Sequence, residues 1–417
     1  MNLKLQDIRV KTNKDIPESV FVQKEQAQHI VNDQQALQVA QTLAEVFKQN
    51  AAYRDAHRLL ALDEIVAFSQ SGLWGINIPK QYGGAQVQYR TLSQVVRILA
   101  SADPALTQIA ENHWSFLEQI RLDANETQKQ FIFGNILTGQ RLGNALSERS
   151  GRTVADFTTR ITKHQDGYKI KGKKFYATGA ILAHWVYAVG LDETGHEVTA
   201  LIPYHAEGLT ILNDWSGLGQ RATASGTVIL DDIQVKAEYV IKPAAGSENI
   251  NLVGTISQLI HASIDAGIAD AAIEDTIAFV RQYTRPWIDA HQEYAVDDQL
   301  TQVSIAELKI KLHAATLMLD RAADFIDQAL QDLTAEKANA ATLAVAEAKV
   351  LSAEIAILAT NKLFELAGTR AALSELNLDR HWRNARTHTL HDPIRWKYKL
   401  IGEYYLKGKY LPHHPWS

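Results

Sequence analysis

The spacing of apolar residues changes twice along this chain, and these changes constrain the fold more than any other feature. From about Asp33 to Thr138, stretches such as QALQVAQTLAEVFKQN and YRTLSQVVRILASAD place apolar residues at i, i+3, i+4 and i+7, which is typical of amphipathic helices. From about Arg141 to Gly246, short β-branched runs such as SGTVILDDIQV alternate with Gly and Asp turns, which predicts strands. From Asn251 onward, three long helical patterns follow.

This order predicts an α+β fold with three domains. We expect an N-terminal α-helical domain at residues 1–139, a middle β domain at residues 140–246 and a C-terminal four-helix-bundle domain at residues 247–417. A length of 417 residues suits two or three domains. The stretch IPKQYGGAQVQ predicts a turn within the first helical zone, and Gly368 is expected to follow the end of the third long helix.

Common cofactor and metal motifs are absent from the sequence. The segment GLGQRA, from Gly217 to Ala222, matches a dinucleotide fingerprint by letter. It lies between strand-like runs and opens no helix, so it predicts a loop rather than an NAD(P)H site. The chain contains no P-loop and no HExxH motif, and we expect no metal site.

Charge and hydropathy narrow the class of protein. The net charge is −5 and the sequence has no long basic run, so nucleic acid is not an expected partner. The N-terminus lacks the apolar core of a signal peptide, and no run of about 18 apolar residues predicts a membrane span. We therefore expect a cytoplasmic protein.

Sulfur usage is low, with no Cys and only Met1 and Met318. The absence of Cys excludes disulfides, thiolate metal ligands and thiol nucleophiles. Random drift in amino-acid composition explains the low number of sulfur-containing residues as well as their selective avoidance, or economy, does. Under the economy interpretation, the protein is made when sulfur is scarce, which motivates a hypothesis of a role in sulfur acquisition.

Four segments in order, IPKQYGG, KGKKFYATGA, RQYTRPW and DRHWRNARTHTLHDP, resemble the acyl-CoA dehydrogenase superfamily. The resemblance covers nearly the whole chain and implies an N-terminal helical domain, a central β-barrel-like domain and a C-terminal helical bundle. The segments GNALSE, NDWSGLGQRATASGTV, TRPW and RNARTHTLHDP look most like the flavin-dependent monooxygenase branch. That branch includes dibenzothiophene monooxygenase and oxidoreductases of sulfur acquisition.

The resemblance implies that His391 replaces a tyrosine and Asp392 the glutamate that removes the substrate α-proton in many dehydrogenases. It places His391 beside the reactive edge of the flavin, as a catalytic and substrate-pocket residue. A histidine suits this place because it donates, accepts or shuttles a proton near neutral pH. Alternatively, His391 caps a helix or pairs with Asp392, which is expected to orient His391 or to pair with an arginine.

The resemblance also assigns roles to residues of the β zone. It implies that Asn144 lies near the flavin carbon that forms the peroxide, that Ser147 lines the flavin, and that Thr178 hydrogen-bonds near flavin N5. Asn144 and Thr178 are thus predicted to be catalytic and, with Ser147, to bind the cofactor. The alternatives are a turn residue for Asn144 and simple strand propensity for Thr178.

Arginines of the helical zone are candidates for binding the flavin phosphate. The resemblance implies that Arg285 binds this phosphate, often that of a neighbouring subunit, since a guanidinium binds phosphate bidentately. Arg281 is a weaker candidate. Arg383 and Arg386 are predicted to neutralise phosphate or carboxylates, with helix-surface pairing as the alternative.

Two further residues, His113 and Trp215, are predicted to line the substrate pocket, and core packing is the alternative for each. His313 lies in an amphipathic helical pattern and is expected to be structural. A homotetramer, a dimer of dimers, is expected because the family's long C-terminal helices assemble in this way.

The cofactor implied by the resemblance is reduced FMN, with FAD possible. Where dehydrogenases carry a Gly-Gly pair near the adenine half of FAD, this chain has Ala367 before a single Gly368. Since no nicotinamide site is evident, the flavin arrives already reduced or takes electrons from the substrate. The first option is the one expected, with a separate NAD(P)H-dependent flavin reductase as partner. The predicted reaction is oxidation of a small sulfide, sulfoxide or sulfone by O2, through a C4a-(hydro)peroxyflavin.

Two alternatives remain open. One is an FAD-dependent acyl-CoA dehydrogenase with Asp392 or another carboxylate as the base, which predicts tightly bound FAD and reduction of a dye by an acyl-CoA. The other is a flavin-free binding or regulatory protein that has kept the fold, which predicts no flavin affinity.

Overall fold

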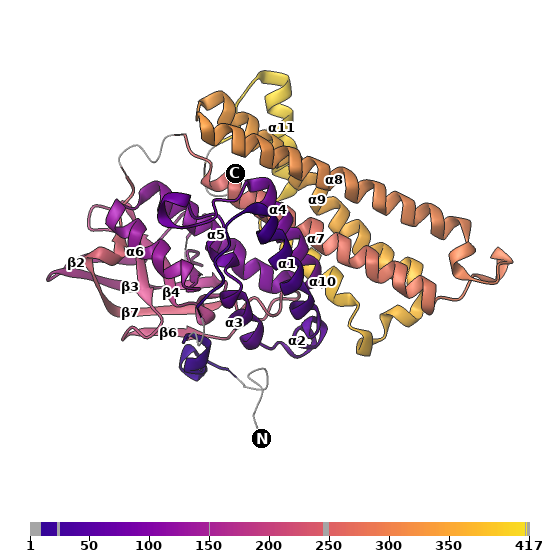
Figure 1. The fold of residues 1–417 in the computed structure, drawn as a ribbon, viewed down its shortest axis with the longest axis horizontal. Coiled ribbons are helices and arrows are strands. Elements are labelled where there is room, and N and C mark those ends of the chain that lie inside the picture. Colours follow the sequence, from indigo (N-terminus) through magenta and orange to yellow (C-terminus); the bar gives the residue numbers. More distant parts are fainter. Residues whose placement is uncertain (1–9, 23–25, 150, 245–249, 413, 415–417) are drawn as a thin grey trace.

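The computed structural model describes residues 10–22, 26–149, 151–244, 250–412 and 414. Figure 1 shows a sheet at one end of the molecule and long helices extending to the other, with the N-terminal helices between them. The single large apolar core runs through all three parts. In the described part of the chain, no helix combines the length and hydropathy needed to cross a lipid bilayer.

The N-terminal helices begin at capping residues that the sequence supplies. Asn32 caps the first helix by accepting a hydrogen bond from the Gln35 backbone N–H, and Asp103 caps the fifth, which has Pro104 at its first position. The helices are α1 (Asp33–Lys48), α2 (Ala51–His57), α3 (Leu62–Gln70), α4 (Tyr89–Ala102), α5 (Pro104–Asp123) and α6 (Glu126–Leu137).

The strands form one eight-stranded sheet in the order β6-β7-β3-β2-β4-β5-β8, with β1 paired to β4 off this path. The β1–β4 pair is parallel and sets Asn144 opposite Tyr187, whereas β3 and β7 are antiparallel. The strands are β1 (Leu142–Ala145), β2 (Arg160–His164), β3 (Gly167–Ala177), β4 (Trp185–Leu191), β5 (Glu197–Pro203), β6 (Leu209–Leu212), β7 (Gly226–Lys236) and β8 (Val240–Ile241).

The α-helices described in the C-terminal part are three long ones and two shorter ones, with short 3-10 turns between them. They are α7 (Val253–Gln282), α8 (Gln299–Gln331), α9 (Ala335–Ala367), α10 (Asp379–His388) and α11 (Ile394–Lys407). Helix α7 packs against α4, α5, α8, α9 and α10. It is mostly apolar around its circumference because neighbours cover it on most sides.

The predicted order of helices, strands and helices is confirmed. Gly83 has a φ of 91° in the predicted turn, and Gly368, with a φ of 75°, follows the last residue of α9. The segment from Gly217 to Ala222 is a loop, as predicted. The predicted boundary between the second and third domains, at 246/247, lies outside the described residues.

A buried guanidinium joins the N-terminal helices. Arg54 is 1% exposed, and it pairs with Glu64 and, at 2.6 Å, with Asp103, the residue that caps α5. Its Nη2 also donates to the Phe47 carbonyl at 2.8 Å. Removing this guanidinium would leave two buried carboxylates without their cation.

We expect Arg54→Met to lower the free energy of unfolding by about 3–5 kcal/mol, because breaking a buried pair leaves uncompensated charge. The control is Arg90→Met, since Arg90 is half-exposed and pairs with Asp320 and Asp324. Exposed pairs contribute about 0–1 kcal/mol. Thermal and urea unfolding of both variants measure the difference, and equal losses would contradict the role given to Arg54.

Candidate functional site

The ends of β1 and β3 bring Asn144 and Thr178 together. The Asn144 backbone N–H donates to the Thr178 carbonyl at 3.1 Å, and the Asn144 side-chain amide donates to the Tyr176 carbonyl at 3.4 Å. Asn144 Oδ1 accepts from the Leu146 N–H at 2.9 Å. Both predicted residues therefore lie at one corner of the sheet, where β1 leaves it.

The segment that carries Ser147 is fixed to β3 by a buried ion pair. The Ser147 carbonyl accepts from the Phe175 N–H at 2.8 Å. Lys174 Nζ contacts Glu148 Oε1 at 2.8 Å, and both side chains are almost fully buried. Burial alone would raise the pKa of Glu148, but hydrogen bonds from Lys174, Thr158 and Thr159 outweigh it and lower the pKa to about 2.

A chain of hydroxyl groups runs from Thr178 into the loop before β7. Thr178 Oγ1 lies 2.7 Å from Ser225 Oγ, which lies 2.7 Å from Thr223 Oγ1. Thr223 in turn donates to the Gln220 carbonyl at 2.9 Å. Thr178 is buried, and its hydroxyl is oriented by this chain rather than by the strand alone.

The loop 217–225 contacts α10 at very close range. The Gln220 N–H donates to Asn384 Oδ1 at 2.7 Å, and the Gly219 N–H donates to Thr387 Oγ1 at 2.9 Å. A Cβ on Gly219 would lie 1.9 Å from the Arg383 carbonyl oxygen, so no side chain fits there. Gly219 is thus required for the packing of the sheet on α10.

His391 lies just beyond α10, at the turn that leads into α11. Its Nδ1 donates to Asp392 Oδ1 at 2.8 Å, and its side chain is 41% exposed. The ring lies against the His261 ring of α7, with centroids 3.9 Å apart and planes inclined by 35°. The hydrogen bond to Asp392 leaves Nε2 of His391 available to a ligand.

Asp392 is held as a carboxylate by a buried lysine. Lys349 Nζ of α9 lies 2.5 Å from Asp392 Oδ2, and Gln258 Nε2 of α7 donates to Oδ1 at 3.3 Å. Burial alone would raise the pKa of Asp392, but Lys349 and the hydrogen bond from His391 hold it well below the ordinary range. Asp392 therefore orients His391, one of the two roles expected for it, and its cationic partner is Lys349 rather than the arginine of the other.

A second group of polar side chains lies beneath His391. His388 Nδ1 lies 2.6 Å from Asp265 Oδ1, and His388 Nε2 lies 2.9 Å from Gln108 Oε1. His261 Nδ1 faces His388 Nε2 at 3.3 Å, and His261 Nε2 faces Glu111 Oε1 at 3.4 Å. All of these residues are buried, at the meeting of α5, α7 and α10.

Helix α5 connects the two halves of the site. Gly179 follows Thr178 with a φ of 70°, and a Cβ there would lie 2.6 Å from Ile109 Cγ2 of α5. On the same helix, Gln108 contacts His388 and Glu111 contacts His261. One helix therefore holds both the Thr178 corner and the histidine cluster, although the two are far apart in sequence.

The backbone near Thr178 is strained. Tyr176, Gln220 and Ala224 have φ values of 54°, 52° and 53°, in the left-handed region that residues other than glycine rarely adopt. Such conformations concentrate at ligand sites, where the surrounding structure maintains them. The Tyr176 and Gln220 carbonyls accept from the Thr178 and Thr223 hydroxyls, and Ala224 lies between Thr223 and Ser225, so all three residues adjoin the hydroxyl chain.

The polar groups around Thr178 are of the kind that a flavin would need. Gln220 is 4% exposed, and neither its side-chain nitrogen nor its side-chain oxygen has a partner among the described residues. An unpaired buried amide is costly, and a ligand edge that alternates donors and acceptors satisfies both of its atoms. With Asn144, Thr178 and the half-exposed His391, this amide provides polar groups of the type that an isoalloxazine edge requires.

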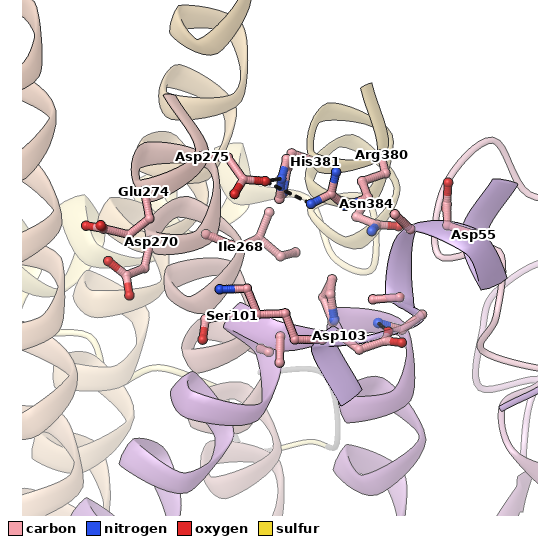
Figure 2. A pocket seen from close by; sticks show the side chains of 18 of the residues that line it. Asp55, Ser101, Asp103, Ile268, Asp270, Glu274, Asp275, Arg380, His381 and Asn384 are labelled. Atoms are coloured by element: carbon pink, nitrogen blue, oxygen red, sulfur yellow. Dashed lines mark hydrogen bonds and ion pairs between the residues drawn. The ribbon is translucent and has the colours of Figure 1, made fainter. Parts of the chain in front are cut away.

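Figure 2 shows a different cavity, of about 140 Å³, on the other side of Asn384. Acidic side chains of α7, Asp270, Glu274 and Asp275, line one wall of this cavity, and Asp275 pairs with His381 at 2.7 Å and with Arg380 at 2.8 Å. The cavity is smaller than ordinary cofactor pockets, and Asn144, Thr178 and His391 do not line it.

His113 is a core residue, so the pocket role predicted for it is corrected. Its Nδ1 accepts from the Leu142 N–H at 2.9 Å and its Nε2 donates to the Trp74 carbonyl at 3.0 Å. It is fully buried, and burial lowers its pKa to about 3. One ring nitrogen joins α5 to β1 and the other joins α5 to the Trp74 backbone, which leaves none for a substrate.

The remaining predicted residues lie in different places. Trp215 is half-buried near Thr178, because its Nε1 donates to the Gln220 carbonyl at 2.8 Å and its ring meets Tyr176 edge-on. Arg383 pairs with Asp55 through two bonds of 2.6 and 3.0 Å, and this pair is buried rather than at the helix surface, where the alternative had placed it. A phosphate-binding role for Arg383 stays a prediction.

Arg285 lies in the exposed connection between α7 and α8, and Arg281 lies in the last turn of α7. Figure 1 shows this connection at the tip of the long helices that points away from the sheet. Within one chain, the fold does not bring Arg285 to Thr178 or His391. Its role at a neighbouring subunit stays a prediction.

The sequence interpretation missed Lys349, His261, His388 and Glu111. Lys349 is a buried lysine within an Ala-rich helix, and such a charge within an apolar pattern is a signal of a paired ion. The other three are polar residues on helix faces that otherwise pack into the core.

Comparison with known proteins agrees with this architecture. Residues 32–140 match the acyl-CoA dehydrogenase N-terminal domain, and residues 259–396 match the acyl-CoA dehydrogenase C-terminal domain.

The chain belongs to the acyl-CoA dehydrogenase family.

Within this family, the chain is similar to proteins named as monooxygenases. It is 32% identical to the probable FMNH2-dependent monooxygenase SfnC of Pseudomonas putida, over 90% of this chain and 95% of that protein. FMN-bound TdsC from Paenibacillus sp. A11-2 superposes with a TM-score of 0.87 at 29% identity, covering 92% of this chain and all of that one. The structure of methanesulfinate monooxygenase MsuC from Pseudomonas fluorescens superposes with a TM-score of 0.84 at 29% sequence identity. The match covers 91% of this chain and 99% of that one.

The neutral, buried state of His113 predicts a pH dependence of stability. Its pKa is about 3 when folded and about 6.5 when unfolded, so the unfolded chain binds more protons between these values. Stability therefore falls as pH drops below about 6.5, by up to about 1.4 kcal/mol per pH unit for this group.

We expect His113→Gln to weaken the dependence of the free energy of unfolding on pH, because unfolding of the variant takes up about one proton fewer. Urea unfolding at pH 7.5, 6.5 and 5.5 measures this dependence. Part of the slope remains in the variant, because burial also lowers the pKa of His184, to about 3. His29→Gln, at an exposed residue, is the control and should keep the wild-type slope. An unchanged slope in His113→Gln would contradict the core assignment.

Proposed function

We propose that this protein is a flavin-dependent monooxygenase that oxidises an organosulfur compound. The observation that carries the proposal is the pair at the α10–α11 turn, in which Lys349 neutralises Asp392 while His391 stays accessible. An imidazole, rather than a free carboxylate, is therefore the group presented to a ligand. The names of the relatives, which include methanesulfinate monooxygenase, support the same activity.

The alternative acyl-CoA dehydrogenase activity needs a carboxylate base. Asp392 is the carboxylate at the corresponding position, but it is paired with Lys349 at 2.5 Å and its pKa is held well below the usual range. A carboxylate stabilised in this way is a poor base, because proton abstraction requires a pKa near the working pH. The ion pair therefore favours oxygen chemistry over α-proton abstraction.

The protein's own residues would hold and orient the reactants. In this proposal, Thr178 and Asn144 bind the polar edge of the flavin, Ser147 lies along it, and His391 holds or moves a proton at its Nε2. Asp392 fixes the His391 ring through Nδ1. When bound there, reduced flavin would supply the two electrons with which O2 is activated for transfer of one oxygen atom to sulfur.

Reduced FMN is the proposed cofactor, supplied by a separate NAD(P)H-dependent flavin reductase. One relative is named as FMNH2-dependent, and the solved structure of another contains FMN. The single Gly368 after α9, in place of a Gly-Gly pair, further favours FMN over FAD. The absence of Cys and the presence of only two Met fit a role in sulfur acquisition.

Assembly of the site would involve a second copy of the chain. We propose a homotetramer in which Arg285 of one chain reaches the flavin phosphate of another, because the connection that carries it is exposed and far from its own site. Arg383 is kept as a further candidate for that phosphate. An exposed guanidinium is well suited to bidentate phosphate binding.

We expect His391→Ala to lower the rate of sulfur oxygenation by about 10²–10⁴-fold, the usual effect of a positioned acid–base group. Hydrogen peroxide release per NADH consumed should rise, because oxygen activated without productive transfer escapes. The assay supplies FMN, a flavin reductase and NADH, and measures product and peroxide together.

The matched control is His196→Ala, since His196 is exposed at the β4–β5 turn. Its product yield should equal that of the wild type. If both variants retained full oxygenation, the role of His391 would be excluded.

Anaerobic titration separates the two enzyme classes. We expect FMNH2 to bind more tightly than FADH2, and acyl-CoA esters to leave enzyme-bound oxidised flavin unreduced, because Asp392 cannot take the α-proton. Admission of O2 to the FMNH2 complex should then give the absorbance of a C4a-peroxide. Rapid bleaching of the flavin by an acyl-CoA without O2 would instead establish the dehydrogenase.

A further inference from the structure

A groove beside the His391 turn has no part in the site described above. It has a volume of about 680 Å³ and lies between α9, the end of α10 and the start of α11. Its described lining includes none of Asn144, Thr178 and Gln220. This volume is in the range of sites that bind small molecules, roughly 300–1,000 Å³.

Most of the lining of this groove is apolar. Ala353, Ile357 and Asn361 of α9 are spaced four apart, so they occupy one face of that helix. Leu390 of the turn and Ile394, the first residue of α11, line the groove as well. Leu390 is 68% exposed, so its side chain is open to solvent and to the apolar part of a ligand.

Two guanidiniums line the same groove without a counter-ion. Arg386 is in the last turn of α10 and Arg395 is the second residue of α11. Among the described residues, neither guanidinium takes part in a hydrogen bond or an ion pair. Acidic residues outnumber lysine and arginine in this chain, so an excess of basic residues does not explain two unpaired cations in one groove.

The charges of the lining indicate the charge of the ligand. Glu354 is the one carboxylate among the described lining residues, and its Oε1 accepts from the Tyr398 hydroxyl at 2.5 Å. Two guanidiniums and one carboxylate leave a single positive charge, which a monoanion compensates. A phosphate monoester carries about −1.5 to −2 at pH 7 and would leave negative charge beside Glu354.

The start of α11 reinforces the preference for an anion that Arg386 and Arg395 set. Pro393 precedes this helix, and no side chain caps its first backbone N–H groups. These N–H groups have no partner within the helix, and the N-terminal end of a helix carries partial positive charge.

We propose that this groove binds a small amphiphilic monoanion. Its carboxylate or sulfonate head contacts Arg386 and Arg395, and its short hydrocarbon chain lies on Ile357 and Leu390. A guanidinium binds either kind of head through paired hydrogen bonds. The groove is a second site, separate from the flavin corner, and the inference does not depend on the monooxygenase function proposed above.

A ligand in the groove acts on the turn that carries His391. Leu390 and Pro393 line the groove and lie on either side of His391 and Asp392 in the sequence. A molecule held between α9 and these two lining residues therefore restrains the turn from both ends.

Calorimetric titration of the full-length protein with sodium hexanoate and sodium hexanesulfonate tests the site and compares the two head groups. We expect one saturable site per chain for both compounds. Hexanol lacks the charge, and acetate and inorganic sulfate lack the hydrocarbon chain. Each of these three should bind at least about 10-fold more weakly.

Arg386→Leu and Arg395→Leu should each lower the affinity for hexanoate about 10-fold, because each removes a charged hydrogen-bond donor. The matched control is Lys362→Leu. Lys362 is a cation of the same α9, pairs with Glu365 at 2.5 Å and does not line the groove. The control should keep the wild-type affinity.

Leu390→Ser separates the apolar contact from the charged one. It should weaken hexanoate binding about 3- to 10-fold and leave the binding of inorganic sulfate unchanged. Because Leu390 is exposed, the substitution should leave folding unaffected.

Hydrogen exchange measures the effect on the turn. At the same concentration, hexanoate should slow exchange of the backbone amides of residues 389–396 at least about 3-fold in the wild type and less in Arg395→Leu. Unchanged exchange in the wild type at saturating hexanoate would overturn the effect on the turn and leave the site itself intact.

Other outcomes overturn the inference. Equal binding of sulfate and hexanoate would show a general anion site, and no saturable binding up to about 10 mM would exclude the site. Unaltered hexanoate affinity in both arginine variants would place the ligand elsewhere. If no anion binds and the assembled protein dissociates in Arg395→Leu and Leu390→Ser, as measured by sedimentation, a second copy of the chain occupies the groove and the inference is wrong.

Discussion

The buried ion pair between Lys349 and Asp392 is the interaction on which the candidate site depends. It joins α9 to the turn between α10 and α11, and Gln258 of α7 contacts both partners. Taking two charges out of water is costly, and removal of either partner would leave the other uncompensated. The pair therefore fixes the backbone of the turn, and Asp392 in turn fixes the ring of its neighbour His391 through Nδ1.

The site is built where the three parts of the chain meet, which explains why its residues are so widely separated in sequence. The sheet contributes Asn144 and Thr178, the N-terminal part contributes α5, and the C-terminal part contributes the histidines of α7 and α10. Each part alone would expose polar groups with incomplete hydrogen bonding. Only the assembled fold pairs them, and among the described residues it leaves both side-chain polar atoms of Gln220 without a partner.

The sequence predicted the helices and strands better than it predicted which side chains contact one another. Helical and strand periods are local, so α1, α4, the strands, the three long helices and the glycine after α9 followed from spacing alone. The positions of His391, Asn144 and Thr178 came from resemblance. The partner of Asp392 did not, because Lys349 is one lysine among many until the fold brings α9 to the turn. His113 was misjudged because a buried histidine with two backbone partners has the same local pattern as a pocket residue.

The contact between Gly219 and the backbone of Arg383 has a consequence for redesign of this protein. A loop that touches a helix main chain with no space for a methyl group cannot shift without moving the helix, so the sheet corner and the histidine turn form one rigid frame. Substitutions within residues 217–225 would therefore disturb the sheet corner that carries Thr178 and the turn that carries His391 together.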